Sequence, residues 1–177
     1  MSVHLARLKE LIPPPSKRKQ FDWATAEKKL GVTLPSDYKQ TVEIYSGGQF
    51  EDYLYLLEPD NEYYDLVELH EERVEAYESL WEWERKPVEL EELGSRIIPW
   101  ATTDSGEYLF WLVRSGWEHD SDRWTVLINE ARGDRWEHFH MGSLAFFVQA
   151  LERKVSSDIL WSRFPLRNHT FQQFIHP

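Results

Sequence analysis

Hydrophobic positions in the first fifty residues recur at helical spacing in three short segments. The first, residues 2–12, reads as an amphipathic helix, and a run of three prolines follows it. Asp22 can cap a second helix, which Gly31 ends, and Ser36 can cap a third, which Gly47-Gly48 ends. The pattern therefore predicts three short helices at the start of the chain.

A short apolar run at residues 53–57 is typical of a strand, and residues 63–83 return to helical spacing. The predicted helix has two contrasting faces, one apolar and one acidic. The apolar face holds Tyr63, Leu66, Val67, Leu69, Val74, Tyr77, Leu80 and Trp81. The acidic face holds Glu68, Glu71, Glu75, Glu78 and Glu82.

After Gly94 the pattern changes to short β segments separated by turn residues. The segment from Tyr108 to Val113 is apolar at every position, which predicts a central strand covered on both faces. An amphipathic helix is expected at residues 144–153, and the aromatic tail at 155–177 is expected to pack back as short helices. The predicted strands are residues 96–103, 107–114, 123–129 and 135–140.

Together these elements predict one α+β domain of 177 residues. We expect a mixed, mostly antiparallel sheet, flanked by the N-terminal helices, the central acidic helix and the C-terminal helix. Residues 1–20 form an N-terminal helix with a proline-rich, basic linker in this interpretation. Residues 152–177 form an extension that packs on the domain.

Composition adds limits on function. The chain has no Cys, which excludes disulfides and thiol chemistry, and an aromatic content of 15%, which suits both a core and a binding surface. The N-terminal segment has no apolar run long enough for a signal peptide or a membrane span, so a cytoplasmic location without a membrane partner is expected.

Charge is distributed very unevenly. Residues 51–95 contain 16 acidic and three basic residues, a net charge of −13, whereas the whole chain carries −11. This acidity argues against direct binding of nucleic acid. The glutamates four residues apart repel one another, so helix stability alone does not account for them.

Two patterns resemble catalytic motifs. Asp104-Ser105-Gly106 has the form of an aspartic peptidase loop, but that chemistry needs two such carboxylates and the chain has one copy, so a turn is the preferred interpretation. His138 and His140 would share one sheet face and could bind a metal with Glu118, His119 or Asp120. Nothing in the spacing demands that third ligand, and we expect no metal, cofactor or catalytic residue.

His70 begins a partial zincin pattern, which fails because Val74 stands where the second histidine is needed. His70 is therefore predicted to be a packed histidine beside the apolar face of its helix.

The ordered residues resemble the SMI1/KNR4 family of the SUKH superfamily, over about residues 23–151. No one motif carries this resemblance; the order and spacing do. The positions are Trp23, Glu27, Leu30-Gly31, Leu34-Pro35, Asp37-Tyr38, Tyr45-Ser46-Gly47-Gly48, Ile98-Pro99-Trp100-Ala101, Asp104, Gly106, Leu109-Phe110-Trp111, Trp136, Phe139, Ser143 and Phe147. The acidic residues 62–94 and the tail beyond residue 152 depart from the family pattern.

The resemblance implies an α+β fold without conserved catalytic residues. Most bacterial members of this family are associated with polymorphic-toxin loci as immunity proteins, which bind and neutralise a cognate toxin that is often a nuclease, and the resemblance implies that function here. Fungal members of the family are regulatory scaffolds, so a scaffold function is an alternative for this chain. A metal-dependent enzyme using His138 and His140 is a third, less favoured hypothesis. The positions implied to be scaffold residues are Trp23, Leu34, Pro35, Tyr38, Gly48, Gly106 and Trp111.

The acidic segment and the resemblance lead to one functional hypothesis. Nuclease toxins are commonly basic, and a strongly acidic segment would attract such a partner and occupy its nucleic-acid groove. Trp83 lies off the apolar face by helical angle and could provide an apolar anchor. The predicted partner-binding residues are Glu68, Glu71, Glu75, Glu78, Glu82 and Trp83.

Overall fold

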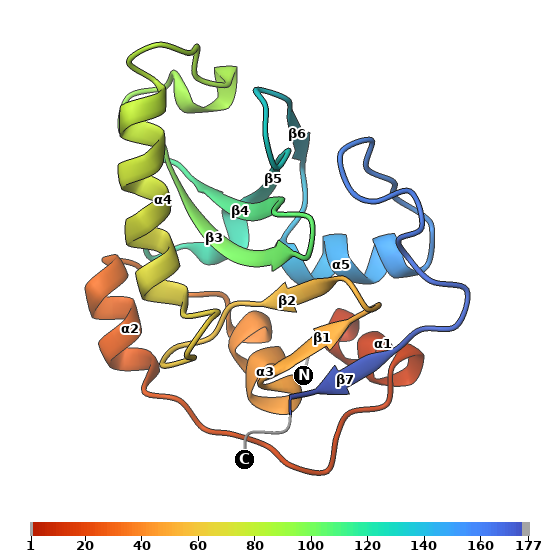
Figure 1. Ribbon diagram of the computed structural model, residues 1–177. Helices are drawn as coiled ribbons and strands as arrows, with labels where there is room; N and C mark the ends of the chain where they lie inside the picture. Colours follow the sequence, from red (N-terminus) through yellow and green to blue (C-terminus); the bar gives the residue numbers. More distant parts are fainter. Residues whose placement is uncertain (1, 175–177) are drawn as a thin grey trace.

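A computed structural model describes residues 2–174, which form five α-helices and a seven-stranded sheet (Figure 1). The strand order is β6-β5-β4-β3-β2-β1-β7, and neighbouring strands pair antiparallel throughout. Within the described residues, the parallel contact is an isolated bridge between Glu58 and Asp65. The predicted α+β class is confirmed.

The four β segments predicted after Gly94 are present, each within two residues of its expected bounds. Short β-type segments and the turn residues between them located these strands correctly. A three-residue strand after the third helix was not predicted, because Gly48 was assigned to the helix end. The strands are β1 (Gly48–Phe50), β2 (Leu54–Leu56), β3 (Arg96–Thr103), β4 (Tyr108–Val113), β5 (Thr125–Asn129), β6 (Trp136–Phe139) and β7 (Phe171–Gln173).

The helices are α1 (Val3–Leu11), α2 (Trp23–Leu30), α3 (Ser36–Tyr45), α4 (Leu66–Leu80) and α5 (Ser143–Leu151). The Asp22 side chain caps α2 by accepting from the N–H of Thr25 at 3.1 Å, and Gly31 ends it with a left-handed φ of 69°. The predicted cap at Ser36 is wrong by one residue: α3 begins at Ser36, and Pro35 holds the cap position.

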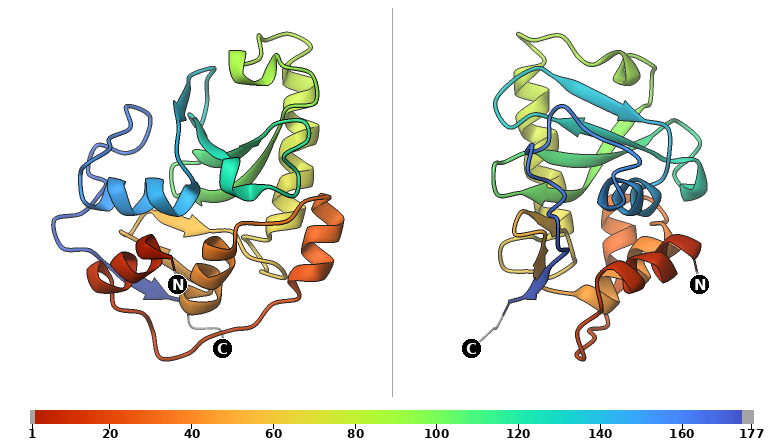
Figure 2. Two further views of the ribbon diagram at one scale, coloured as in Figure 1. Left: turned by 180° about the vertical axis from the view of Figure 1, so that it is seen from behind. Right: turned by 90° about the vertical axis from the view of Figure 1, so that its right-hand side faces the viewer.

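The sheet is covered on both faces, so its central strand, β4, is buried at every residue after Tyr108. Leu109 and Trp111 of β4 point into the main core with α1, α3 and α5, whereas Phe110 and Leu112 point to the opposite face, where Tyr77 of α4 packs. Figures 1 and 2 show α4 on one side of the sheet and α1, α3 and α5 on the other. This confirms the doubly covered strand predicted at residues 108–113.

The apolar face of α4 is narrower than its sequence predicts. The helix ends at Leu80, and Tyr63 lies before its first turn with 70% of its surface exposed. Val74 and Leu80 are also exposed, because only the side of α4 that carries Leu66 and Tyr77 is buried against neighbouring elements. The buried part of α4 is thus limited to the narrow side that directly contacts its neighbours.

The tail does not form the short helices that were predicted for residues 155–174. It runs in loops across the end of α5, buries Leu160 in the main core, and ends in β7, which pairs with β1 at the sheet edge. Residues 175–177 of that prediction lie outside the described residues. The aromatic side chains of the tail pack on the domain as expected, but loops and a short strand carry them in place of helices.

Several residues that the family resemblance implied to be scaffold residues hold the core together. Tyr38 packs edge-on against Trp111 with ring centroids 4.7 Å apart, and its hydroxyl donates to the carbonyl oxygen of Leu57. Gly48 lies so close to β7 that a Cβ atom would come within 2.6 Å of the Gln172 carbonyl oxygen. Gly106 has a φ of 93°, which favours glycine.

Candidate partner-binding surface

Helix α4 starts at a well-formed cap. The Asp65 carboxylate accepts hydrogen bonds from the N–H groups of Val67 and Glu68, both at 2.8 Å. Its second oxygen accepts from the N–H of Asp60 at 2.6 Å, which ties the cap to the preceding turn. Asp65 therefore fixes where the acidic helix begins and how it leaves the sheet.

The five glutamates of the predicted acidic face, Glu68, Glu71, Glu75, Glu78 and Glu82, are all exposed. Among residues 2–174, none of the five forms an ion pair with Lys, Arg or His. Four of them lie on α4 and Glu82 follows two residues after it. We refer to these five residues as the α4 acidic face.

The charge of α4 runs against the stability of the helix itself. Its last turn has no basic residue, and Glu78 lies there, where the partial negative charge of the helix end disfavours a carboxylate. Glu71 and Glu75 repel each other at a spacing of four residues. Within residues 2–174, no ion pair compensates these charges.

The acidity of residues 51–95 is not all available at the surface. Glu51, Glu58 and Asp65 are buried and accept hydrogen bonds from the protein's own backbone. Glu58 accepts from the N–H of Gly47 at 2.9 Å, for example, and so ties the chain after α3 to the segment between β2 and α4. The sequence count of −13 therefore overstates the charge that a partner would meet.

Trp83 and Trp81 lie in very different environments. Trp83 is 88% exposed, as predicted, but it lies in the turn that follows α4 and is not part of the helix. Trp81 stacks on Tyr77 with ring centroids 5.0 Å apart and is half-buried. Of the two tryptophans, Trp83 is thus the one with a side chain available to a partner, which agrees with the prediction.

Two further exposed apolar residues near Trp83 were missed by sequence reasoning. Val88 is 68% exposed and Leu93 is 96% exposed, and both lie in the segment that joins α4 to β3, at the top of Figure 1. Leu90, between them, is buried. The sequence spacing of these three residues gives no sign of which one is covered.

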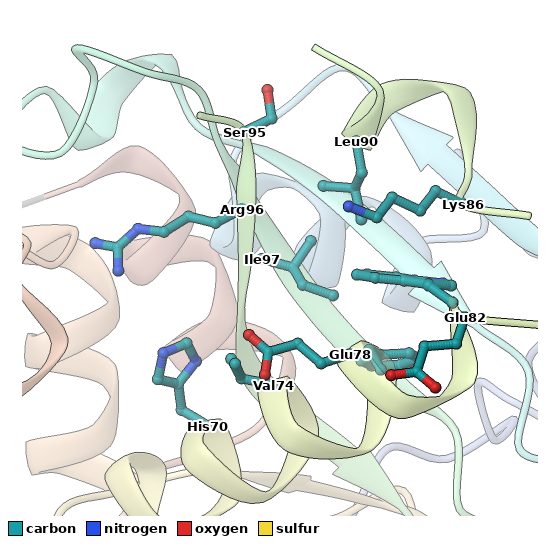
Figure 3. A pocket seen from close by; sticks show the side chains of 11 residues that line it. His70, Val74, Glu78, Glu82, Lys86, Leu90, Ser95, Arg96 and Ile97 are labelled. Carbon is teal, nitrogen blue, oxygen red and sulfur yellow. The ribbon is translucent and has the colours of Figure 1, made fainter. Parts of the chain in front are cut away.

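A cleft of about 460 Å³ opens between α4, the segment after it and the start of β3 (Figure 3). We call it the α4–β3 cleft. It combines an apolar floor with charged groups at both ends. Its lining residues are His70, Val74, Tyr77, Glu78, Trp81, Glu82, Lys86, Leu90, Ser95, Arg96 and Ile97.

The charged groups in the α4–β3 cleft are separated along its length. The Arg96 guanidinium donates to the carbonyl oxygens of Leu30 at 2.9 Å and Gly31 at 3.3 Å, so it is held at the α2 end. Figure 3 shows that Arg96 points away from Glu78 and Glu82, which lie toward the other end. Burial lowers the pKa of Arg96 without making it neutral at ordinary pH.

His70 lies at the Arg96 end and is packed beside the apolar side of α4, as its sequence position predicted. Its Nδ1 atom is buried without a hydrogen-bond partner among the described residues. Burial, and then the charge of Arg96, lower the pKa of His70 to about 4. His70 is consequently neutral near pH 7.

His138 and His140 do share a sheet face, with ring centroids 4.0 Å apart. The nearest acidic oxygen to His138 is Glu89 Oε1, at 3.5 Å from Nδ1. Of the three suggested third ligands, His119 instead contacts the Thr33 hydroxyl at 2.9 Å. In the part of the chain that the structure describes, no three His, Asp or Glu side chains are arranged to hold a metal ion.

Asp104-Ser105-Gly106 forms the turn between β3 and β4, as predicted. The N–H of Gly106 donates to the Thr103 carbonyl oxygen at 3.1 Å. The Asp104 carboxylate accepts from the Tyr55 hydroxyl at 2.5 Å and from Gln49 Nε2 at 2.8 Å. This side chain links the turn to β1 and β2 and has a structural role.

A family model described as SMI1-KNR4 cell-wall, SUKH_6, matches residues 20–148, most of the chain. The chain therefore belongs to the SMI1/KNR4 family of SUKH proteins. No curated protein and no solved structure matched the chain significantly.

The family match and the described fold differ in extent. The match ends within α5, so β7 and the loops before it lie beyond the matched region. None of the helices described in residues 2–174 is long and apolar enough to cross a membrane.

Proposed function

We propose that this protein is an immunity protein that neutralises a cognate toxin by binding it directly, without catalysis. The observation that carries the proposal is the α4 acidic face, a row of exposed and unpaired glutamates in a member of the SMI1/KNR4 family. A basic toxin domain, such as a nuclease, provides the complementary charge. Covering its nucleic-acid groove would be sufficient for inhibition.

Electrostatics supports fast and specific capture of such a partner. Charges of one sign on one side of a protein steer an oppositely charged partner and raise the association rate. The exposed apolar residues Trp83, Val88 and Leu93 follow the acidic face and could provide the desolvated contacts that slow dissociation. The proposed surface is therefore α4 together with the segment that joins it to β3.

Gene context and growth rescue provide the test. The C-terminal toxin domain encoded beside this gene would be expressed with and without the protein, and the purified pair would be examined for a one-to-one complex. Rescue of growth together with complex formation is expected. If the pair neither associates nor restores growth, and several endogenous proteins are captured instead, the protein is a regulatory scaffold.

A charge-reversal variant tests the surface itself. Replacing Glu71, Glu75 and Glu78 by Lys should weaken toxin binding by roughly 10- to 100-fold at low salt, because three attractive interactions become repulsive. The circular dichroism spectrum should stay unchanged, since all three side chains are exposed.

The matched control reverses Asp120, Asp122 and Asp158, which are exposed, form no ion pair among the described residues, and neither belong to α4 nor line the α4–β3 cleft. It changes the net charge by the same amount. Equal losses in the two variants would show that only overall charge matters, and an unchanged affinity in the α4 variant would reject the surface.

A further inference from the structure

The α4–β3 cleft has a rigid aromatic floor beside the acidic face. Trp81 stacks on Tyr77 with an angle of 19° between the ring planes. Tyr77 is fixed in turn, because its hydroxyl donates to Asn129 Oδ1 at 2.7 Å and its ring packs against Phe110 and Trp136. The face of Trp81 is therefore held in place from beneath.

A cation already lies on this aromatic face in the free protein. The Lys86 Nζ atom is 5.1 Å from the centre of the Trp81 ring, within the range of a cation–π interaction. Figure 3 shows the Lys86 side chain reaching into the cleft from the segment after α4. Lys86 itself is exposed and forms no ion pair among the described residues, so little holds it there.

Two carboxylates lie beside the same aromatic floor. Glu78 and Glu82 line the cleft on its α4 side, and neither has a cationic partner in residues 2–174. The other cation of the cleft, Arg96, is engaged with the carbonyl oxygens at the end of α2. His70 adds no positive charge near neutral pH. The Trp81 end of the cleft is thus built to receive a positive group.

From these contacts we propose that the α4–β3 cleft accepts an arginine side chain of the protein partner. Its guanidinium would stack on Trp81 in place of Lys86 and pair with Glu78 or Glu82. Arginine suits the site better than lysine, because a planar guanidinium stacks on an aromatic ring and forms paired hydrogen bonds with a carboxylate. The partner's identity rests on the proposed function, whereas the chemistry of the cleft does not.

A peptide assay tests the cleft without any toxin. The probe is the capped tripeptide acetyl-Gly-Arg-Gly amide, and the reference is the same peptide with citrulline, which has the same shape without the charge. Binding is followed through the indole N–H signal of Trp81 in proton–nitrogen correlation spectra, assigned with the Trp81→Phe variant. The arginine peptide should shift this signal saturably at millimolar concentration, and the citrulline peptide should bind at least about fivefold more weakly.

Variants separate the contributions of the side chains. Lys86→Ala removes the competing cation and should strengthen peptide binding by roughly three- to tenfold. The double variant Glu78→Gln with Glu82→Gln should weaken it by at least about fivefold, whereas Glu72→Gln, an exposed glutamate outside the cleft, should leave it unchanged. All four substituted positions are exposed, so the fold of each variant is expected to persist.

Three outcomes would overturn the inference. Equal binding of the arginine and citrulline peptides would show an apolar groove without preference for a cation. A Trp81 signal that no peptide shifts would show that the cleft binds neither. A toxin complex whose affinity is unaffected by Trp81→Ala would separate the cleft from the interface while the proposed function stands. Conversely, a failed growth rescue leaves the peptide result valid.

Discussion

His70 shows how strongly a single environment can alter a side chain that the sequence presents as ordinary. It lies on α4 where the helix faces Arg96, and its Nδ1 atom is buried without a hydrogen-bond partner among the described residues. Burial penalises the charged imidazolium, and the nearby guanidinium repels it, so the pKa falls to about 4. This lowered pKa leads to a testable prediction about how the stability of the fold depends on pH.

The folded protein should lose stability as pH falls from about 7 to about 4, in part because of His70. The unfolded chain binds a proton near the ordinary pKa of 6.5, whereas the folded chain binds it only near 4. Between these values the unfolded state holds more protons, so protonation favours unfolding, by on the order of 2–3 kcal/mol in total. Urea unfolding of the wild type and of His70→Gln at pH 7 and pH 4.5 measures this difference.

The variant lacks the titrating group, so its stability should decline less over the same pH interval. His140→Gln is the control, because His140 is exposed. If His70→Gln and the wild type lost the same free energy of unfolding between the two pH values, His70 would not be the group that the folded state keeps neutral.

At the scale of the element, α4 combines a firm start with an unfavourable charge pattern. Asp65 caps its N-terminus, but the remaining acids repel one another and its last turn has no cation. A helix with this pattern can be stabilised by removing charge. The conflict between stability and charge is expected where a surface is used for binding.

Glu75→Lys should therefore raise the stability of the free protein. It removes repulsion from Glu71, Glu72 and Glu78, and it places a lysine four residues after Glu71, the favourable order for a helical ion pair. The expected gain is about 0.5–1 kcal/mol in the free energy of unfolding at low salt. Urea unfolding with and without added salt measures it, and Glu75→Gln separates the loss of repulsion from the new attraction.

The proposed function requires the same substitution to weaken toxin binding. A gain in stability with unchanged toxin binding would mean that this part of α4 lies outside the interface. A loss of stability would mean that Glu75 makes a favourable interaction that its exposure does not suggest.

Sequence patterns predicted the positions of those strands that are specified by their own residues. Strands β3 to β6 were predicted to within two residues, because short apolar segments and the turn residues between them are local signals. Strands β1 and β7 were missed because each has three residues and is specified by its partner, with Gly48 paired to Gln173. The α4–β3 cleft was missed for a related reason, since it exists only where α4 lies beside Arg96 and Ile97.

The acidic segment illustrates the same limit for the candidate site. All 16 of its acidic residues look alike in the sequence, yet Glu51, Glu58 and Asp65 are buried and bound to backbone N–H groups, while the α4 acidic face is exposed. Asp65 is a helix cap with local donors, but no local pattern marks Glu51 and Glu58, whose backbone donors lie elsewhere in the chain. The distinction depends on which backbone donors the fold brings to each carboxylate.

At the scale of the whole molecule, the tail is joined to the domain through Glu51. This carboxylate has no exposed surface and accepts from the N–H groups of Leu166 at 2.7 Å and Thr170 at 2.9 Å, with His169 Nδ1 at 3.1 Å. The three donors all belong to the tail. Glu51 also immediately follows β1, which pairs with β7. One buried charge thus connects the first strand to the last.

Glu51→Gln should destabilise the protein by about 1–3 kcal/mol, because an amide group would place N–H donors against N–H donors. Thermal unfolding measures the loss, and limited proteolysis should show earlier cleavage between α5 and β7. Glu62→Gln, an exposed change of the same type in the same segment, should have little effect. Equal proteolysis of both variants would show that the tail is held by its aromatic packing alone.

The pairing of β1 with β7 also affects how the protein is made. β1 leaves the ribosome more than a hundred residues before β7 is made, so the growing chain carries an open sheet edge and a carboxylate without its donors until residues 166–173 have been added. A polypeptide that stops before Leu166 would have to bury that carboxylate without those partners. Copies cut short before Leu166 would therefore be poorly stable and open to degradation.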